Sequence, residues 1–305
     1  MTPMTEDMNS TIGEEYNIQN LAIHVTAGIT FAAGIMINTF IVAVYVTDWM
    51  KQRPMASTDQ ILTSLGITRF LYESTSLLDI FLHNFFEINI GYELTVFCIF
   101  ATSFYANIWL ANLLSVVFCL KICNFQDVFF LRLKIMILQR VVHLIIACVL
   151  VSICYSLTFL FITTTGVLRN SSNKTNNWER DEIEKYMFLW WNVVPFLIVF
   201  ISSVLLISSL CHHVNIMRCD RAVTGQLDTY YKTIKFSAFS FLSYTFYFIT
   251  HVTLWFYQGS FDDLGENLIL SVFPTLHSVY LIYVTARLRT QFCKILQHAS
   301  KFRLN

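Results

Sequence analysis

The chain has 305 residues, of which 55% are hydrophobic and 13% are charged, and its formal net charge is zero. Soluble domains carry about 25% charged residues, so this composition argues against a soluble protein and for a membrane protein. Proline and glycine are scarce, with 4 and 9 residues, and the apolar runs are long and unbroken, which favours helices over a membrane β-barrel.

Seven segments are apolar over about the 20 residues that a membrane-spanning helix needs. They cover residues 21–46, 60–84, 96–120, 138–165, 186–211, 233–257 and 267–286. The connections are short, except 166–185 and 212–232, and none is a linker to a second domain. We therefore expect an all-α membrane protein: a seven-transmembrane helix bundle over 21–286, a short extracellular amino terminus over 1–20 and a short cytoplasmic tail over 287–305.

The basic residues predict the orientation, because cytoplasmic loops carry an excess of Lys and Arg. With the amino terminus outside, fifteen Lys and Arg residues lie in inner segments and four, all within 166–185, lie in outer ones. Three N-glycosylation sequons, at Asn9, Asn170 and Asn173, also fall in outer segments. Both patterns place the amino terminus outside and the carboxyl terminus inside. Residues 1–20 contain no Lys or Arg, so we expect an uncleaved first helix rather than a signal peptide.

Polar residues inside the predicted spans are costly and usually face the protein interior. Arg69 is the most demanding, since an arginine at the bilayer centre costs about 2.5–3.5 kcal/mol on insertion scales. Glu73 follows one turn later, so the two side chains can pair on one helix face. Two interpretations stay open: a structural ion pair, or a switch in which Arg69 changes partners between conformations.

One stripe of the third segment combines three kinds of side chain. Its members fall within an arc of about 100° on a helix: Phe100, Phe104, Asn107, Ala111, Leu114, Phe118 and Lys121. The outer end is aromatic, the middle holds an amide, and the lysine lies at the cytosolic boundary, where it can reach water. The stripe either faces a ligand or packs against other helices.

Sequence motifs of enzymes are absent, since the chain contains no HExxH, no GxSxG, no phosphate-binding loop and no pair of CxxC motifs. We therefore expect no catalytic residue, no metal, no cofactor and no nucleic-acid partner. A transporter stays open as an alternative, although no inverted repeat and no glycine-broken pair of helices supports it.

Four motifs, in order along the chain, resemble the type 2 taste receptors, the bitter taste receptor family of G-protein-coupled receptors. They are NTFIVAVYVTDWMKQRPMASTDQILTSLGITR (38–69), WLANLLSVVFCLKICNF (109–125), PFLIVFISSVLLISSLCHH (195–213) and PTLHSVYLI (274–282). The resemblance covers nearly all of 20–295.

The sequence departs from the family pattern at a few positions. The family usually has Tyr where this chain has Cys119, and Gly-Asn where it has Val284-Thr285. At the outer positions of the third helix it often has Trp and Asn, in place of Phe100 and Phe104. Glu73 is also unusual. These departures suggest an aromatic, apolar pocket with few donors.

The resemblance implies a multi-pass receptor of the plasma membrane for small-molecule agonists, coupled to a gustducin-like heterotrimeric G protein, with phospholipase C and calcium signalling downstream. An outward-facing helical pocket is then expected, lined by Phe100, Phe104, Asn107, Met187, Trp191, Tyr247 and Asn267. For each of these residues, plain packing is the alternative. A vomeronasal type 1-like chemosensory receptor is an alternative function, and a homo- or hetero-oligomer stays open.

The resemblance also suggests roles for polar residues elsewhere in the bundle. The residues expected to face the G protein are Lys121, His213, Lys232 and Lys235. The same residues could instead bind the anionic surface of the lipid bilayer. The candidates for interhelical contacts that change on activation are Asn38, Arg69, Glu73, Asn112, His277 and Ser278.

Overall fold

The computed structural model describes residues 3–85, 90–123, 128–170, 177–219, 224–256 and 263–303. Near several helix ends, and at single positions such as 213 and 267, only the backbone is described. The side chains of Asn9, Asn170, His213 and Asn267 therefore lie outside what the structure describes, and Asn173 lies outside the described residues altogether.

The described residues form nine helices and no strand. The helices are α1 (Pro3–Met50), α2 (Ser57–Phe85), α3 (Ile90–Ile122), α4 (Val128–Gln139), α5 (Val141–Asn170), α6 (Asn177–Cys219), α7 (Thr224–Phe256), α8 (Asp263–Val284) and α9 (Ala286–Arg303).

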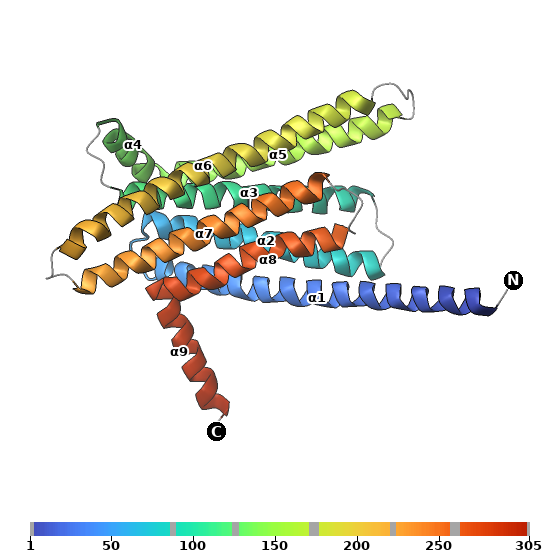
Figure 1. Cartoon of the computed structure of the whole chain (residues 1–305), viewed down its shortest axis with the longest axis horizontal. Helices are drawn as coiled ribbons and strands as arrows, with labels where there is room; N and C mark the ends of the chain where they lie inside the picture. The colour runs from blue at the N-terminus through green and yellow to red at the C-terminus, as the bar shows by residue number, and fades with distance from the viewer. Residues whose placement is uncertain are drawn as a thin grey trace.

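Seven long helices lie side by side and form the bundle: α1, α2, α3, α5, α6, α7 and α8 (Figure 1). Helix α3 packs on α2, α5 and α6, while α8 joins α1 to α7. The start of α1 lies at one end of the bundle, which we call the amino end. Helices α4 and α9 lie at the opposite end, which we call the carboxyl end (Figure 1). Because successive long helices run in opposite directions, residues far apart in sequence meet at mid-bundle.

Helices α4 and α9 were not expected, since they fall in a predicted connection and in the predicted tail. Helix α4 has 12 residues, which is too short to cross a bilayer. Helix α9 carries Arg287, Arg289, Lys294, Lys301 and Arg303, so its hydropathy is low. A search for apolar runs of spanning length therefore misses α4, which is too short, and α9, which is too polar.

Among the described residues, four single helices are long and apolar enough to cross a membrane: Leu21–Met50, Gly91–Ile122, Val141–Ile162 and Tyr186–His212. Leu268–Val284 of α8 and Ala286–His298 of α9 pass the same test only as a pair, bent by 89°. Helix α2 carries charged residues such as Arg69 and Glu73, and α7 is rich in Ser, Thr and Tyr and carries Lys232 and Lys235, which lowers their hydropathy. The all-helical architecture and its apolar helices are those of a multi-pass membrane protein.

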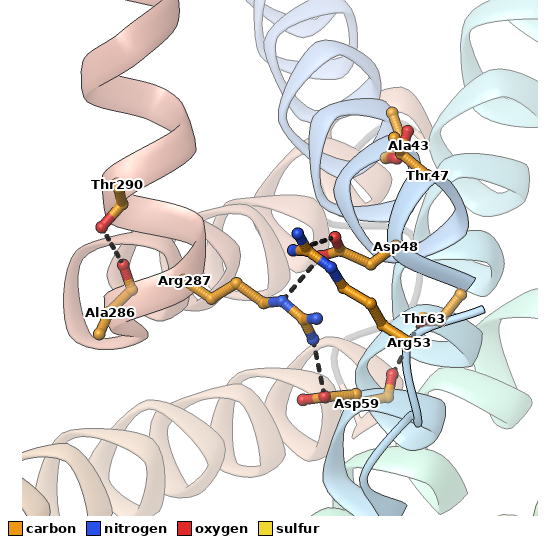
Figure 2. Close-up of polar contacts among 9 residues, drawn as sticks. All are labelled: Ala43, Thr47, Asp48, Arg53, Asp59, Thr63, Ala286, Arg287 and Thr290. Atoms are coloured by element: carbon orange, nitrogen blue, oxygen red, sulfur yellow. Dashed lines mark hydrogen bonds and ion pairs between the residues drawn. The ribbon is translucent and has the colours of Figure 1, made fainter. Parts of the chain in front are cut away.

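An ion-pair cluster fastens the start of α9 to the connection between α1 and α2 (Figure 2). Nε of Arg287 lies 2.7 Å from Oδ2 of Asp48, and Nη1 lies 3.0 Å from Oδ2 of Asp59. Nη1 of Arg53 lies 3.1 Å from Oδ1 of Asp48. The Arg287 guanidinium also lies 5.7 Å from the centre of the buried Tyr45 ring. Asp48 is at the end of α1 and Asp59 at the start of α2, so one side chain joins three helices.

We predict that Arg287→Ala lowers the thermal melting temperature of the purified protein, because Asp59 loses its ion pair and Asp48 keeps only Arg53. Hydrogen bonds to charged groups contribute about 1.5–3 kcal/mol each. Arg289→Ala is the matched control, since among the described residues the Arg289 side chain hydrogen-bonds only to the carbonyl of Tyr283, at 3.5 Å. Equal melting temperatures of the two variants would contradict the structural role of the cluster.

Candidate functional site

A buried polar network crosses the middle of the bundle. It consists of Asn38 from α1, Arg69 and Glu73 from α2, Asn107 from α3, Ser240 from α7, and Thr275, His277 and Ser278 from α8. An aromatic cluster with Tyr72, Phe104 and Tyr247 lies toward the amino end. An aliphatic core with Leu65, Leu110 and Leu281 lies toward the carboxyl end. The network therefore ties five helices together at the boundary of two apolar regions.

Arg69 is the centre of this network and is only 4% exposed. Its Nε donates to Oδ1 of Asn107 at 2.9 Å, and its Nη1 donates to Oγ of Ser278 at 2.6 Å. Both terminal nitrogens lie 3.3 Å from Nδ1 of His277. The guanidinium thus gives its protons to neutral acceptors on two other helices, which offsets part of the cost of burying it.

Ser278 and Asn38 connect this cation to the carboxylate of Glu73. The Ser278 hydroxyl donates to Oδ1 of Asn38 at 2.9 Å, and Nδ2 of Asn38 donates to Oε2 of Glu73 at 3.1 Å. Thr275 donates to the other carboxylate oxygen at 3.1 Å. Every bond on this path donates toward Glu73, so the hydrogen-bond dipoles point from the cation to the anion. Within the described residues, no direct ion pair joins Arg69 to Glu73, unlike the pairing on one helix face that the sequence suggested.

Gly34 makes the position of the carboxylate possible. A Cβ atom at residue 34 would overlap the carboxyl group of Glu73. The carboxylate therefore lies directly against the backbone of α1, where Asn38 also donates to the carbonyl of Gly34 at 3.0 Å. A glycine at this position lets α1 and the Glu73 side chain approach closely.

The contacts of His277 define which of its nitrogens carries the proton. A guanidinium can only donate, so Nδ1 accepts from Arg69 and the proton resides on Nε2. Nε2 lies 3.3 Å from the hydroxyl oxygen of Ser240, which then accepts from it. The hydroxyl proton of Ser240 is therefore left to donate to another group.

A cavity of about 90 Å³ adjoins the network between α3, α6, α7 and α8. Arg69, Asn107 and His277 line it from the network side. Most of its lining is aromatic or aliphatic. Six Ser and Thr side chains also line it: Ser115, Ser203, Thr233, Ser237, Ser240 and Ser243. Because Phe118 and Thr233 line it as well, the cavity extends from mid-bundle toward the carboxyl end, deeper than the outward pocket expected from the sequence.

Of the residues predicted to line an outward pocket, those with described side chains belong to the cavity, to the aromatic cluster or, for Tyr247, to both. Asn107 and Tyr247 line the cavity. Phe100, Phe104, Met187 and Trp191 belong with Tyr247 to the aromatic cluster, where the rings of Phe100 and Phe104 are stacked 6.2 Å apart.

Sequence reasoning missed a polar pair in this aromatic cluster. Nδ1 of His251 lies 3.0 Å from Oδ1 of Asn192, and the His251 ring lies 5.3 Å from the Phe104 ring. Thr275 and Ser240 were missed too, since a lone hydroxyl in an apolar helix gives no distinctive signal. Asn192 and His251 could have been found, because an amide and an imidazole inside apolar helices are costly without a partner.

Asn112 and the predicted G-protein-facing lysines lie apart from the network. Nδ2 of Asn112 donates to the carbonyl of Ile108 at 2.8 Å and lies 3.4 Å from the Tyr244 hydroxyl. Lys121 is exposed at the carboxyl end of α3, with its Nζ 3.5 Å from Oγ1 of Thr58, and Lys232 and Lys235 are exposed on α7.

Comparison with known proteins gives a consistent result over nearly the whole chain. The family model for taste receptor protein (TAS2R) matches residues 16–300. Taste receptor type 2 member 4 of Pongo pygmaeus is 31% identical over 285 residues, covering 86% of this chain and 92% of that protein. The same receptor of Homo sapiens is 30% identical over 285 residues with equal coverage. Taste receptor type 2 member 46 of Gorilla gorilla gorilla is 27% identical over 295 residues, covering 88% of this chain and 91% of that protein.

We predict that Gly34→Ala destabilises the bundle, because the Glu73 carboxylate must move away from α1 and its hydrogen bonds with Asn38 and Thr275 are weakened. Gly28→Ala is the matched control on the same helix, since a Cβ there meets nothing within 4 Å. Alanine is the better helix former, so Gly28→Ala should leave stability unchanged or raise it by about 0.5–1 kcal/mol. The thermal melting temperatures of the purified variants measure both effects, and a Gly34→Ala protein as stable as Gly28→Ala would refute the close contact.

Proposed function

The chain belongs to the taste receptor type 2 family, whose members are bitter taste receptors of the G-protein-coupled class, and we propose that it binds small organic compounds inside the bundle and activates a heterotrimeric G protein. Receptors of this class are not enzymes. A gustducin-like partner, with phospholipase C and calcium signalling downstream, is the coupling that the family favours.

The observation that carries this proposal is the contact between the cavity and the buried polar network. Arg69, Asn107 and His277 line the cavity and belong to the network that ties five helices together. A compound in the cavity therefore touches the same side chains that fix the helix arrangement. A ligand shifts a conformational equilibrium only through such a difference in contacts between two states. Arg69 exchanging partners among Asn107, His277 and Ser278 is the change that we propose on activation, with Asn38, Glu73 and Asn112 adjusting around it.

We propose that agonists enter from the amino end and pass the aromatic cluster before they reach the cavity. Phe104, Tyr247 and Trp191 offer ring faces that suit many apolar compounds at modest affinity. Phe100, Met187 and Asn267 would complete this entrance.

The orientation that we propose places the amino end outside the cell and the carboxyl end in the cytosol, with seven spans in the plasma membrane. The excess of Lys and Arg in the segments at the carboxyl end supports it. Lys121, His213, Lys232 and Lys235 would then face the G protein. Glycans at Asn9, Asn170 and Asn173 would lie on the outer side.

The test of this function is calcium release in cells that express the chain with a gustducin-chimeric G protein, against a panel of bitter compounds. We expect a dose-dependent response that cells without the receptor lack. Nucleotide exchange on the purified G protein should rise with the same compounds. Silence at confirmed surface expression would contradict the proposal, and solute flux without nucleotide exchange would indicate a transporter instead.

A further inference from the structure

We propose that the cavity selects small organic anions, in particular apolar compounds with one carboxylate, and that Arg69 and Tyr247 bind the acid group. This inference rests on the proposed function, because it names the class of ligand for the same cavity. Three properties of the cavity lining support it: its charge, its donors and its walls.

The lining of the cavity carries positive charge without a matching negative charge. Among the described residues, Arg69 is the single charged side chain in its lining, and Glu73 takes no part in that lining. The carboxylate of Glu73 instead lies against Gly34 and accepts from Asn38 and Thr275, on the far side of the network. A ligand in the cavity therefore meets the guanidinium without its balancing anion. In a region of low dielectric constant, this arrangement attracts a carboxylate and repels an ammonium group.

Three hydrogen-bond donors along the lining remain available to a ligand. A guanidinium has five N–H groups. The contacts of Arg69 use at most four of them, so at least one N–H of Nη2 remains to donate to a ligand. The hydroxyl of Tyr247 is buried and makes no hydrogen bond with another described residue. The Ser240 hydroxyl accepts from His277 and keeps its own proton to donate. A carboxylate accepts without donating, so it satisfies all three groups, whereas an ammonium satisfies only hydroxyl oxygens.

The walls argue for an apolar body on this anion. Phe236, Phe241, Tyr244 and Phe273 line the cavity with aromatic surface. A bare inorganic ion would leave this surface uncovered, while a ring would cover it. The volume of about 90 Å³ favours a compact ligand.

The first experiment compares three ligands that share one ring and differ in charge: benzoate, benzamide and benzylammonium. Each is added to the purified full chain in nanodiscs of uncharged lipid at neutral pH, and the shift in thermal melting temperature reports binding. We expect the apparent dissociation constant of benzoate to be at least tenfold lower than those of the other two. Equal binding of all three, or stronger binding of benzamide or benzylammonium, would overturn the inference.

A charge placed in the lining gives a second test that does not disturb Arg69. Ser237 lines the cavity, is buried, and is not a member of the buried polar network. Ser237→Asp should weaken benzoate binding at least tenfold and strengthen benzylammonium binding. Ser237→Asn is the control of equal size and should keep the preference for benzoate. If Ser237→Asp retains the benzoate affinity of the unaltered chain, the acid group does not bind in this cavity.

The failure of this inference can be told apart from the failure of the proposed function. Nucleotide exchange driven by other bitter compounds, without any preference for benzoate, would overturn the anion selectivity alone. Benzoate binding that follows the charge at position 237, without exchange for any compound, would overturn the receptor function and leave the anion site standing.

Discussion

Burying the guanidinium of Arg69 inside a membrane bundle is the constraint on which the rest of the structure depends. An unpaired cation at this depth would be expelled, so the surrounding helices must supply acceptors. Asn107, His277 and Ser278 supply them from α3 and α8. Asn38 then accepts a hydrogen bond from Ser278 and donates one to Glu73. Satisfying one side chain therefore specifies how α1, α2, α3 and α8 are rotated and how far each is shifted along its axis.

The distance between the two charges has a functional consequence. A direct ion pair would neutralise Arg69 and leave it little reason to interact with anything else. Because Ser278 and Asn38 stand between the charges, Glu73 stabilises the cation from a distance while the guanidinium still faces the cavity. The same arrangement makes the network sensitive to a ligand, since a new acceptor in the cavity competes with the neutral acceptors of Arg69. Structure and proposed signalling thus share one set of hydrogen bonds.

The sequence predicted which residues lie inside the bundle better than it predicted what they touch. The predicted apolar segments overlap the seven long helices, and the cost of burial singled out Arg69 and Glu73. Periodicity, however, gives the face of one helix and says nothing of the axial shift between two helices. The bridge through Ser278, the part played by Thr275 and the depth of the cavity all depend on that shift. Helices α4 and α9 escaped prediction because one is too short and the other too polar for a search based on membrane spans.

The most direct test of this account compares two buried serines of α8. The Ser278 hydroxyl joins Arg69 to Asn38, whereas the Ser271 hydroxyl, within the part of the chain that the structure describes, bonds only the carbonyl of Leu268 in its own helix. Both residues are no more than 1% exposed, so their burial is matched. The melting temperature of purified Ser278→Ala should fall well below that of Ser271→Ala, because buried donors and acceptors left unpaired cost about 1–3 kcal/mol each. Equal melting temperatures would contradict the claim that the bridged charges hold the bundle together.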